Sequence, residues 1–92
     1  MISDALQLKP AAVEVNGATI AVSRPSVLDM IDALEHSRKT PETMLAWLVL
    51  RHARTSAGAP MFATLEEVLA CDVHAVSRLG QGIQALYEEG RD

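Results

Sequence analysis

The sequence holds 92 residues, 49% of them hydrophobic, with 8 basic and 12 acidic side chains and a formal net charge of −4. This length fits a single domain over residues 1–92, and such a domain buries only about 60–65% of the surface that its unfolded chain exposes, so we expect a modest core. The acidic balance argues against nucleic acid as a partner, because phosphate backbones are bound mainly by clustered Lys and Arg.

The number of cysteines and the length of the longest apolar run bear on the cellular compartment of the protein. Cys71 is the only cysteine, so no intrachain disulfide can form, whereas small domains in oxidising compartments usually carry several. Residues 1–24 lack the basic and apolar regions of a signal peptide, and the longest apolar run, residues 44–50, is far shorter than a membrane span. We therefore expect a cytoplasmic protein without a membrane partner.

A β-hairpin is predicted for residues 11–23, after an arm over residues 1–10 that shows no sustained period. Asn16-Gly17 stands between two runs of β-forming residues, AAVEV and ATIAV, and both turn residues accept the positive φ of a type I′ turn. The resulting register opposes Val15 with Ala18, Val13 with Ile20 and Ala11 with Val22, which puts these six apolar side chains on one face. A lone hairpin is marginal in water, so this face must cover a helix or join the sheet of another chain.

Two helices are predicted next. Ser26 begins the first, over residues 26–38, with Asp29 as its partner in a weak form of the capping box. The apolar positions of this helix are Val27, Met30, Ile31 and Leu34, and its polar face carries Asp29, Asp32, Glu35 and His36. The second helix, over about residues 41–54, contains MLAWLVL and is apolar on all sides, so we expect it at the centre of the fold.

Two further helices follow a loop at residues 56–60. Thr64 and Glu67 form a capping box for a short third helix, and Asp72 is the predicted N-cap of a fourth that ends before Gly90. The side chains expected to face inward are Leu65, Val68 and Leu69 in the third helix and Val76, Leu79, Ile83 and Leu86 in the fourth.

The predicted fold class is therefore α+β: mostly α-helical, with an N-terminal β-hairpin followed by about four helices in residues 24–92. Gly80 and Gly82 are anomalous in the last helix, because each costs about 1 kcal/mol relative to alanine within a helix. They indicate close backbone packing, a kink, or tolerance on an exposed face.

No catalytic, cofactor-binding or metal site is predicted. His36, His52 and His74 stand on different predicted helices without the i, i+4 spacing of a helical metal site, and we interpret them as surface or boundary residues. Cys71 and His74 are candidates for a nucleophile and its base, but the helix-cap setting beside Asp72 favours a small buried apolar side chain. No base, nucleophile and orienting group come together in the pattern, so we expect a protein that is not an enzyme.

Protein partners are the remaining expectation. Arg51, His52 and Arg54 form the only basic cluster, which either suits the negative end of the second helix or pairs with the acidic tail of a neighbouring subunit. Trp47 and Leu50 are core residues or, on an exposed face, anchors for a partner. The hairpin face and the central helix exceed what four short helices can cover, so we expect a homo-oligomer. The predicted partner-binding residues are Val13, Val15, Ile20 and Val22 in the hairpin, and Trp47 and Leu50 in the helix.

The order of hairpin, capped helix, apolar central helix, loop and acidic terminal helix resembles the tail assembly chaperones of long-tailed bacteriophages. The similarity is carried by VEVNGATIAVSRPSVLDMIDAL, residues 13–34, and more loosely by residues 41–54 and 61–87. The resemblance implies a non-enzymatic helper of virion morphogenesis, in the host cytoplasm if a phage or prophage encodes it. Such a protein binds the long helical tape-measure protein, keeps it soluble, and helps recruit tail-tube subunits around it.

Two other classes of protein compete with this interpretation. A small homo-oligomeric adaptor or an antitoxin-like regulatory binding module would use the same apolar surfaces for self-association. A small enzyme is the third class, and it lacks the constellation of side chains described above.

Overall fold

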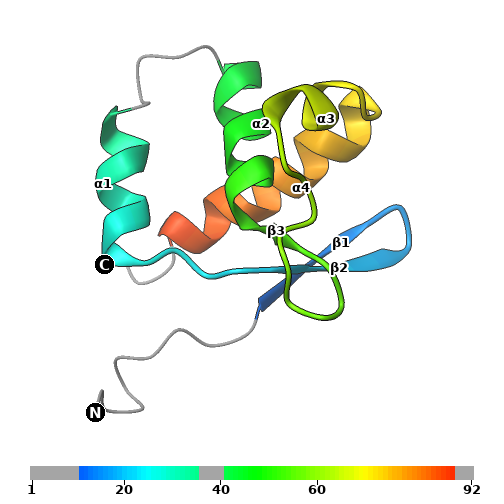
Figure 1. The fold of residues 1–92 in the computed structure, drawn as a ribbon, viewed down its shortest axis with the longest axis horizontal. Coiled ribbons are helices and arrows are strands. Elements are labelled where there is room, and N and C mark those ends of the chain that lie inside the picture. Colours follow the sequence, from blue (N-terminus) through cyan, green and yellow to red (C-terminus); the bar gives the residue numbers. More distant parts are fainter. Residues whose placement is uncertain (1–10, 36–40, 89–92) are drawn as a thin grey trace.

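The computed structural model describes residues 11–35 and 41–88, and its fold is α+β, as the sequence predicts. A three-stranded antiparallel sheet in the order β1-β2-β3 is combined with four helices in these residues (Figure 1). The elements are β1 (Ala11–Val15), β2 (Ala18–Val22), α1 (Val27–Glu35), α2 (Pro41–His52), β3 (Ala53–Arg54), α3 (Leu65–Leu69) and α4 (Val73–Glu88). The predicted arm over residues 1–10 and His36 lie outside the described residues. Within them, no helix has the length and apolar character needed to cross a membrane.

The β1–β2 hairpin has the predicted turn and register. Asn16 and Gly17 have φ angles of 50° and 83°, the positive values that a type I′ turn requires at both central positions. The strand pairs are Val15 with Ala18, Glu14 with Thr19, Val13 with Ile20, Ala12 with Ala21, and Ala11 with Val22. The apolar face of the hairpin packs against α4 of the same chain. Of the two predicted arrangements, the structure thus shows the one in which this face covers a helix.

A third strand lies where the sequence predicts the end of a helix. α2 ends at His52, and β3 follows at once, with Ala53 paired to Val22 and Arg54 paired to Ala21. The predicted second helix is therefore two residues too long. A strand of two residues is too short to show an alternating pattern, and its place is fixed by the neighbouring strand rather than by its own sequence.

The core lies where α2 crosses α4, with the sheet and α3 closing it. In Figure 1, α2 stands between α1 on one side and α3 on the other, as the expected central helix. The buried apolar side chains are Val15, Val22, Ala46, Leu48, Val49, Ala53, Val68, Leu79 and Ile83. His52 is also completely buried, and it is the one buried polar side chain of the described residues.

Gly80 and Gly82 allow close backbone packing, the first of the three interpretations of these residues. A Cβ added to Gly80 would lie 2.9 Å from Leu45 Cβ and 3.0 Å from the Leu45 carbonyl oxygen. A Cβ added to Gly82 would overlap Val13, with its Cγ2 only 2.9 Å away and its Cγ1 closer still. The two glycines therefore let α4 approach α2 through one face and the hairpin through another.

Side-chain caps begin α3 and α4 as predicted. The Thr64 hydroxyl accepts from the Glu67 amide at 3.4 Å, and the Glu67 carboxylate accepts from the Thr64 amide at 3.0 Å, which completes the capping box. The Asp72 carboxylate accepts from the Ala75 amide at 3.0 Å. These short-range hydrogen bonds satisfy amides that have no partner inside the helix.

The inward orientation predicted for Leu69 is wrong. Its neighbour Val68 is completely buried, whereas Leu69 is 63% exposed. Adjacent helical residues diverge by about 100°, and a helix of one and a half turns cannot direct both into the same core.

The first helix begins as predicted, with reciprocal bonds between its cap residues. The Ser26 amide donates to Asp29 Oδ2 at 2.8 Å, and the Asp29 amide donates to Ser26 Oγ at 3.1 Å. α1 spans Val27–Glu35, and the last three residues of the predicted range 26–38 lie outside the described residues.

Candidate functional site

α1 leaves most of its large apolar side chains exposed. An amphipathic helix normally faces its apolar stripe toward the core, but no residue of α1 is buried. Four large apolar side chains form what we call the α1 outer face: Val27 (81% exposed), Leu28 (61%), Ile31 (50%) and Leu34 (65%). Figure 1 shows α1 standing apart at one side of the molecule.

Arg51 of α2 explains this orientation, because it pairs with the acidic residues of α1. Its Nε donates to Asp29 Oδ1, and its Nη2 lies 2.8 Å from Asp32 Oδ2. The guanidinium also lies over the Trp47 ring, 5.5 Å from its centroid, in the range of a cation–π contact. The polar face of α1 is thereby held against the body of the protein.

The same contacts keep Asp29 ionised. Burial alone would raise the pKa of this carboxyl, but the hydrogen bond from the Ser26 amide and the Arg51 guanidinium outweigh burial, so the pKa lies below its ordinary value of 3.8. The ion pair with Arg51 is therefore present at neutral pH.

A partly buried hydrogen-bond network surrounds the His52 ring. Its Nδ1 lies 3.0 Å from the Ser23 carbonyl oxygen and 2.9 Å from Ser23 Oγ, and its Nε2 lies 2.5 Å from the Tyr87 hydroxyl. A carbonyl oxygen can only accept, so we assign the proton to Nδ1, which leaves Nε2 to accept from Tyr87. The network joins the β2–α1 linker, the end of α2 and the end of α4.

Both titratable groups of this network are neutral near pH 7. Burial lowers the pKa of His52 below its ordinary value of 6.5, against the nearby charge of Asp29, which raises it. Burial also raises the pKa of Tyr87. The interpretation of His52 as a surface or boundary residue is therefore wrong: the ring fills the core and is fully hydrogen-bonded.

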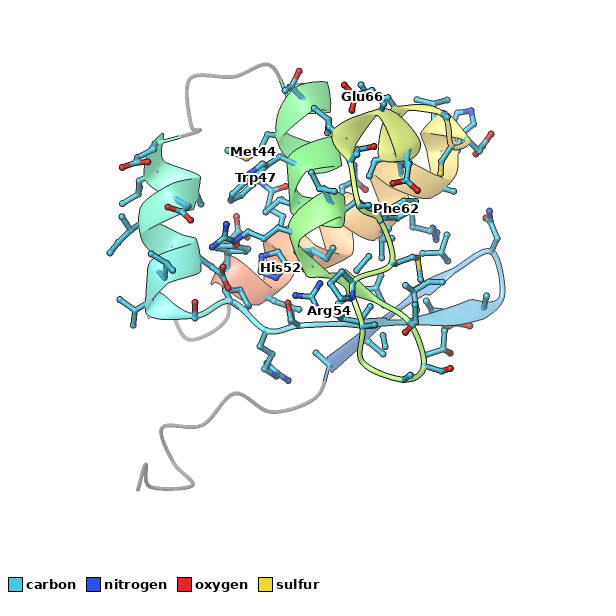
Figure 2. All side chains as sticks on the ribbon, in the orientation of Figure 1. Met44, Trp47, His52, Arg54, Phe62 and Glu66 are labelled. Carbon is cyan, nitrogen blue, oxygen red and sulfur yellow. The ribbon has the colours of Figure 1, made fainter. Side chains whose placement is uncertain are left out.

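An apolar groove lies between α1 and the adjoining parts of α2 and α4. One cavity of about 210 Å³ is lined by Met30, Ala33, Leu34, Met44, Leu48 and Tyr87, with the exposed residues Gln84 and Glu88; we call it the methionine groove. A second, more open cavity of about 370 Å³ shares Met30 and Tyr87 with it and extends toward Pro25 and Val27. Figure 2 shows Met44 and Trp47 pointing from α2 toward α1. The groove and the α1 outer face together form one continuous apolar surface.

The structure places most of the predicted partner-binding residues inside the fold. Val15 and Val22 are buried in the core, and Val13 and Ile20 are half-buried against it. Trp47 and Leu50 are also half-buried and pack against the core. The six residues do not form one exposed surface. Of the large apolar side chains that are exposed in the described residues, four lie on α1, and Leu69 and Val73 are the others.

The basic cluster at the end of α2 serves contacts within the chain. Arg54 Nη1 donates to the carbonyl oxygens of Arg51 and Ala53 at 2.9 and 3.1 Å, which caps the last turn of the helix. Arg51 itself is paired with α1, as described above. Of the two interpretations of this cluster, the observed contacts favour the charge at the helix end.

The remaining chemical candidates are spread over the surface. Cys71 is exposed, so the interpretation of it as a small buried apolar side chain is wrong. Its thiol lies 3.4 Å from the Glu67 carbonyl oxygen, and His74 is exposed on α4. In residues 11–35 and 41–88, no three His, Cys, Asp or Glu side chains gather in a way that could hold a metal ion.

Comparisons of the chain with protein-family models, with curated proteins and with solved structures found no match. The functional argument therefore depends on the geometry of the site. What that geometry offers is apolar contact surface, with flexible side chains and few charges.

Proposed function

We propose that this chain is a tail assembly chaperone that binds a helical segment of a tape-measure protein in the methionine groove and helps recruit tail-tube subunits. The observation that carries the proposal is this apolar groove, which adjoins the exposed apolar side chains of α1, because contiguous exposed apolar surface marks sites of protein interaction. Binding of this kind requires no catalysis and no cofactor.

The side chains of the groove suit a helical client of variable sequence. Met30 and Met44 are unbranched and have three rotatable bonds, so they can adapt to different apolar side chains. A helix laid into a groove presents its apolar residues at positions i, i+3, i+4 and i+7. A long tape-measure helix repeats such a stripe many times, so one adaptable groove per chaperone could coat it segment by segment.

A blocking substitution tests the proposal without touching the core. Gln84 is exposed and lines the methionine groove, so Gln84→Trp should fill the groove and leave the fold intact. Gln81 is also exposed on α4 and does not line this groove, which makes Gln81→Trp the matched control. The readout is the soluble fraction of the tape-measure protein encoded by the same genome, co-expressed with each variant.

We expect the wild type and Gln81→Trp to keep the tape-measure protein soluble and Gln84→Trp to lose most of this effect. Added salt should release little bound client, because apolar burial is only weakly screened. Equal solubilisation by Gln84→Trp would reject the methionine groove as the binding site. If the chain is instead a homo-oligomeric adaptor without chaperone activity, even the wild-type protein would not keep the tape-measure protein soluble.

A further inference from the structure

α1 needs a permanent covering that the described chain does not supply. It has nine residues, and isolated helices shorter than about 12–15 residues are only marginally stable in water. Helices of this length are normally stabilised by burying an apolar face, yet the four apolar side chains of the α1 outer face are half or more exposed. A client present only during assembly would leave this face uncovered for the rest of the time.

We propose that a second copy of this chain covers the α1 outer face, so that two α1 helices pack against each other in antiparallel orientation. This inference does not depend on the proposed chaperone activity. It assigns the outer face of α1 to self-association and leaves Met30, Ala33 and Met44 to the methionine groove. Leu34 lies at the boundary because it also lines that groove, and Val27 and Ile31 also line the more open cavity beside it.

Charge favours a second copy on this face. Each chain carries a net charge of −4, so two copies repel unless they meet where charges are few or already paired. Asp29 and Asp32 lie on the other side of α1, where they share the single positive charge of Arg51. Glu35 is the one charged residue in the exposed arc of the helix that carries the outer face. The exposed arc of α1 therefore carries one charge, at the end of the helix, and is otherwise apolar.

The position of Glu35 sets the orientation of the pair. It is the last residue of α1, so in a parallel pair the two Glu35 side chains would lie beside each other and repel. In an antiparallel pair, each Glu35 lies beside the first turn of the opposite helix, where the partial positive charge of the helix dipole stabilises a carboxylate. An antiparallel arrangement also brings Ile31, the middle residue of α1, next to its own copy.

The size of the face predicts a weak dimer. The nine described residues of α1 span about 13 Å, and four partly exposed side chains form a patch of roughly a few hundred Å², about the size of the largest apolar patch on a typical monomer. A standard stable interface buries about 800 Å² on each partner. The α1 pair falls below this, so we expect dissociation constants on the order of micromolar to tens of micromolar rather than nanomolar.

Sedimentation velocity over a concentration series tests the interface. Ile31→Glu places a charge at the centre of the outer face, and Leu69→Glu places one on α3 at a comparably exposed position, 63% against 50%. We expect the wild type and Leu69→Glu to dimerise over about 5–500 µM, and the dissociation constant of Ile31→Glu to rise more than about tenfold. Circular dichroism confirms that both variants are folded.

Wild-type dimerisation that Ile31→Glu leaves unchanged would overturn the proposal, because the interface would then lie elsewhere. A wild-type monomer at all concentrations would also overturn it, and would leave the outer face to the client helix.

Disulfide trapping tests the orientation independently. In a Cys71→Ser background, Ile31→Cys should form disulfide-linked dimers when diamide is added as the oxidant. Glu35→Cys should not, because antiparallel packing about Ile31 separates the two copies of residue 35 by about 12 Å along the axis, beyond the roughly 7 Å limit for a disulfide. Trapping of both variants would show parallel helices and overturn the antiparallel arrangement. Trapping of neither would overturn the interface.

Discussion

An alanine in place of His52 should lower the free energy of unfolding by about 3–5 kcal/mol, which is a large share of the stability of a domain this small. The ring is completely buried, so its removal leaves a cavity. It also leaves the Tyr87 hydroxyl and the Ser23 carbonyl without their partner in the core. Urea unfolding followed by circular dichroism measures the loss.

The matched control is His74→Ala, because His74 is exposed on α4. This variant should stay within about 0.5 kcal/mol of the wild type. If His52→Ala were no less stable than His74→Ala, the buried network would not hold the linker and the two helices together.

Burial of His52 also predicts a loss of stability in acid. Because the pKa of His52 in the folded protein lies below 6.5, the unfolded chain binds a proton first as the pH falls through that value. The free energy of unfolding should therefore decrease below pH 6.5, and a further decrease from Asp29 should begin near pH 3.8. Thermal melting between about pH 7.5 and pH 5 tests the contribution of His52.

Replacing Gly82 with alanine should also destabilise the protein, although helix propensity alone predicts a gain of about 1 kcal/mol. The added Cβ would overlap the Val13 side chain, and overpacking of this kind typically costs about 1–3 kcal/mol. We therefore expect a lower melting temperature, measured by circular dichroism. Gly80→Ala should also lower the melting temperature. The added Cβ would crowd the Leu45 carbonyl oxygen, a backbone atom that cannot move away as a side chain can.

A second substitution separates the steric cause from other effects. Val13→Ala removes the overlapping atoms, so combining it with Gly82→Ala should cost less than the sum of the two single variants. A Gly82→Ala variant that melts above the wild type would show that the close approach of α4 to the hairpin does not exist in solution.

Local interactions are the part of the fold that the sequence predicts well. Asn16-Gly17 determines the hairpin register because a two-residue turn leaves one pairing. Thr64 with Glu67, and Asp72 with the following amides, determine where helices begin because donor and acceptor lie within three residues. Such features need no knowledge of the rest of the chain.

The orientation of α1 could not be predicted in the same way. Its apolar stripe is visible in the sequence, but Arg51, which turns the acidic face inward, lies 22 residues from Asp29. His52 is hydrogen-bonded to Ser23 and Tyr87, which lie 29 and 35 residues away in the sequence. Contacts between distant residues thus override the usual inward orientation of the apolar stripe in α1. Similar contacts make His52, a polar residue at the end of an apolar run, part of the core.

The methionine groove could not be predicted from the sequence either, because its residues come from distant parts of the chain. The methionine groove combines residues from α1, α2 and α4, and Met30 and Met44 each look like ordinary core residues in their own helix. The hairpin residues Val15 and Val22 were the more conspicuous apolar candidates, and the chain buries them itself.

NMR of methionine methyl groups tests most directly whether a client helix binds in the methionine groove. The chain has four methionines: Met30 and Met44 line the groove, Met61 packs against the core elsewhere, and Met1 lies outside the described residues. Titration of ¹³C-methyl-labelled protein with a helical tape-measure peptide should shift the Met30 and Met44 signals in a saturable manner and leave that of Met61 in place. If the peptide binds and these two signals do not move, or if Met61 alone moves, the client binds at another surface and the proposed site is wrong.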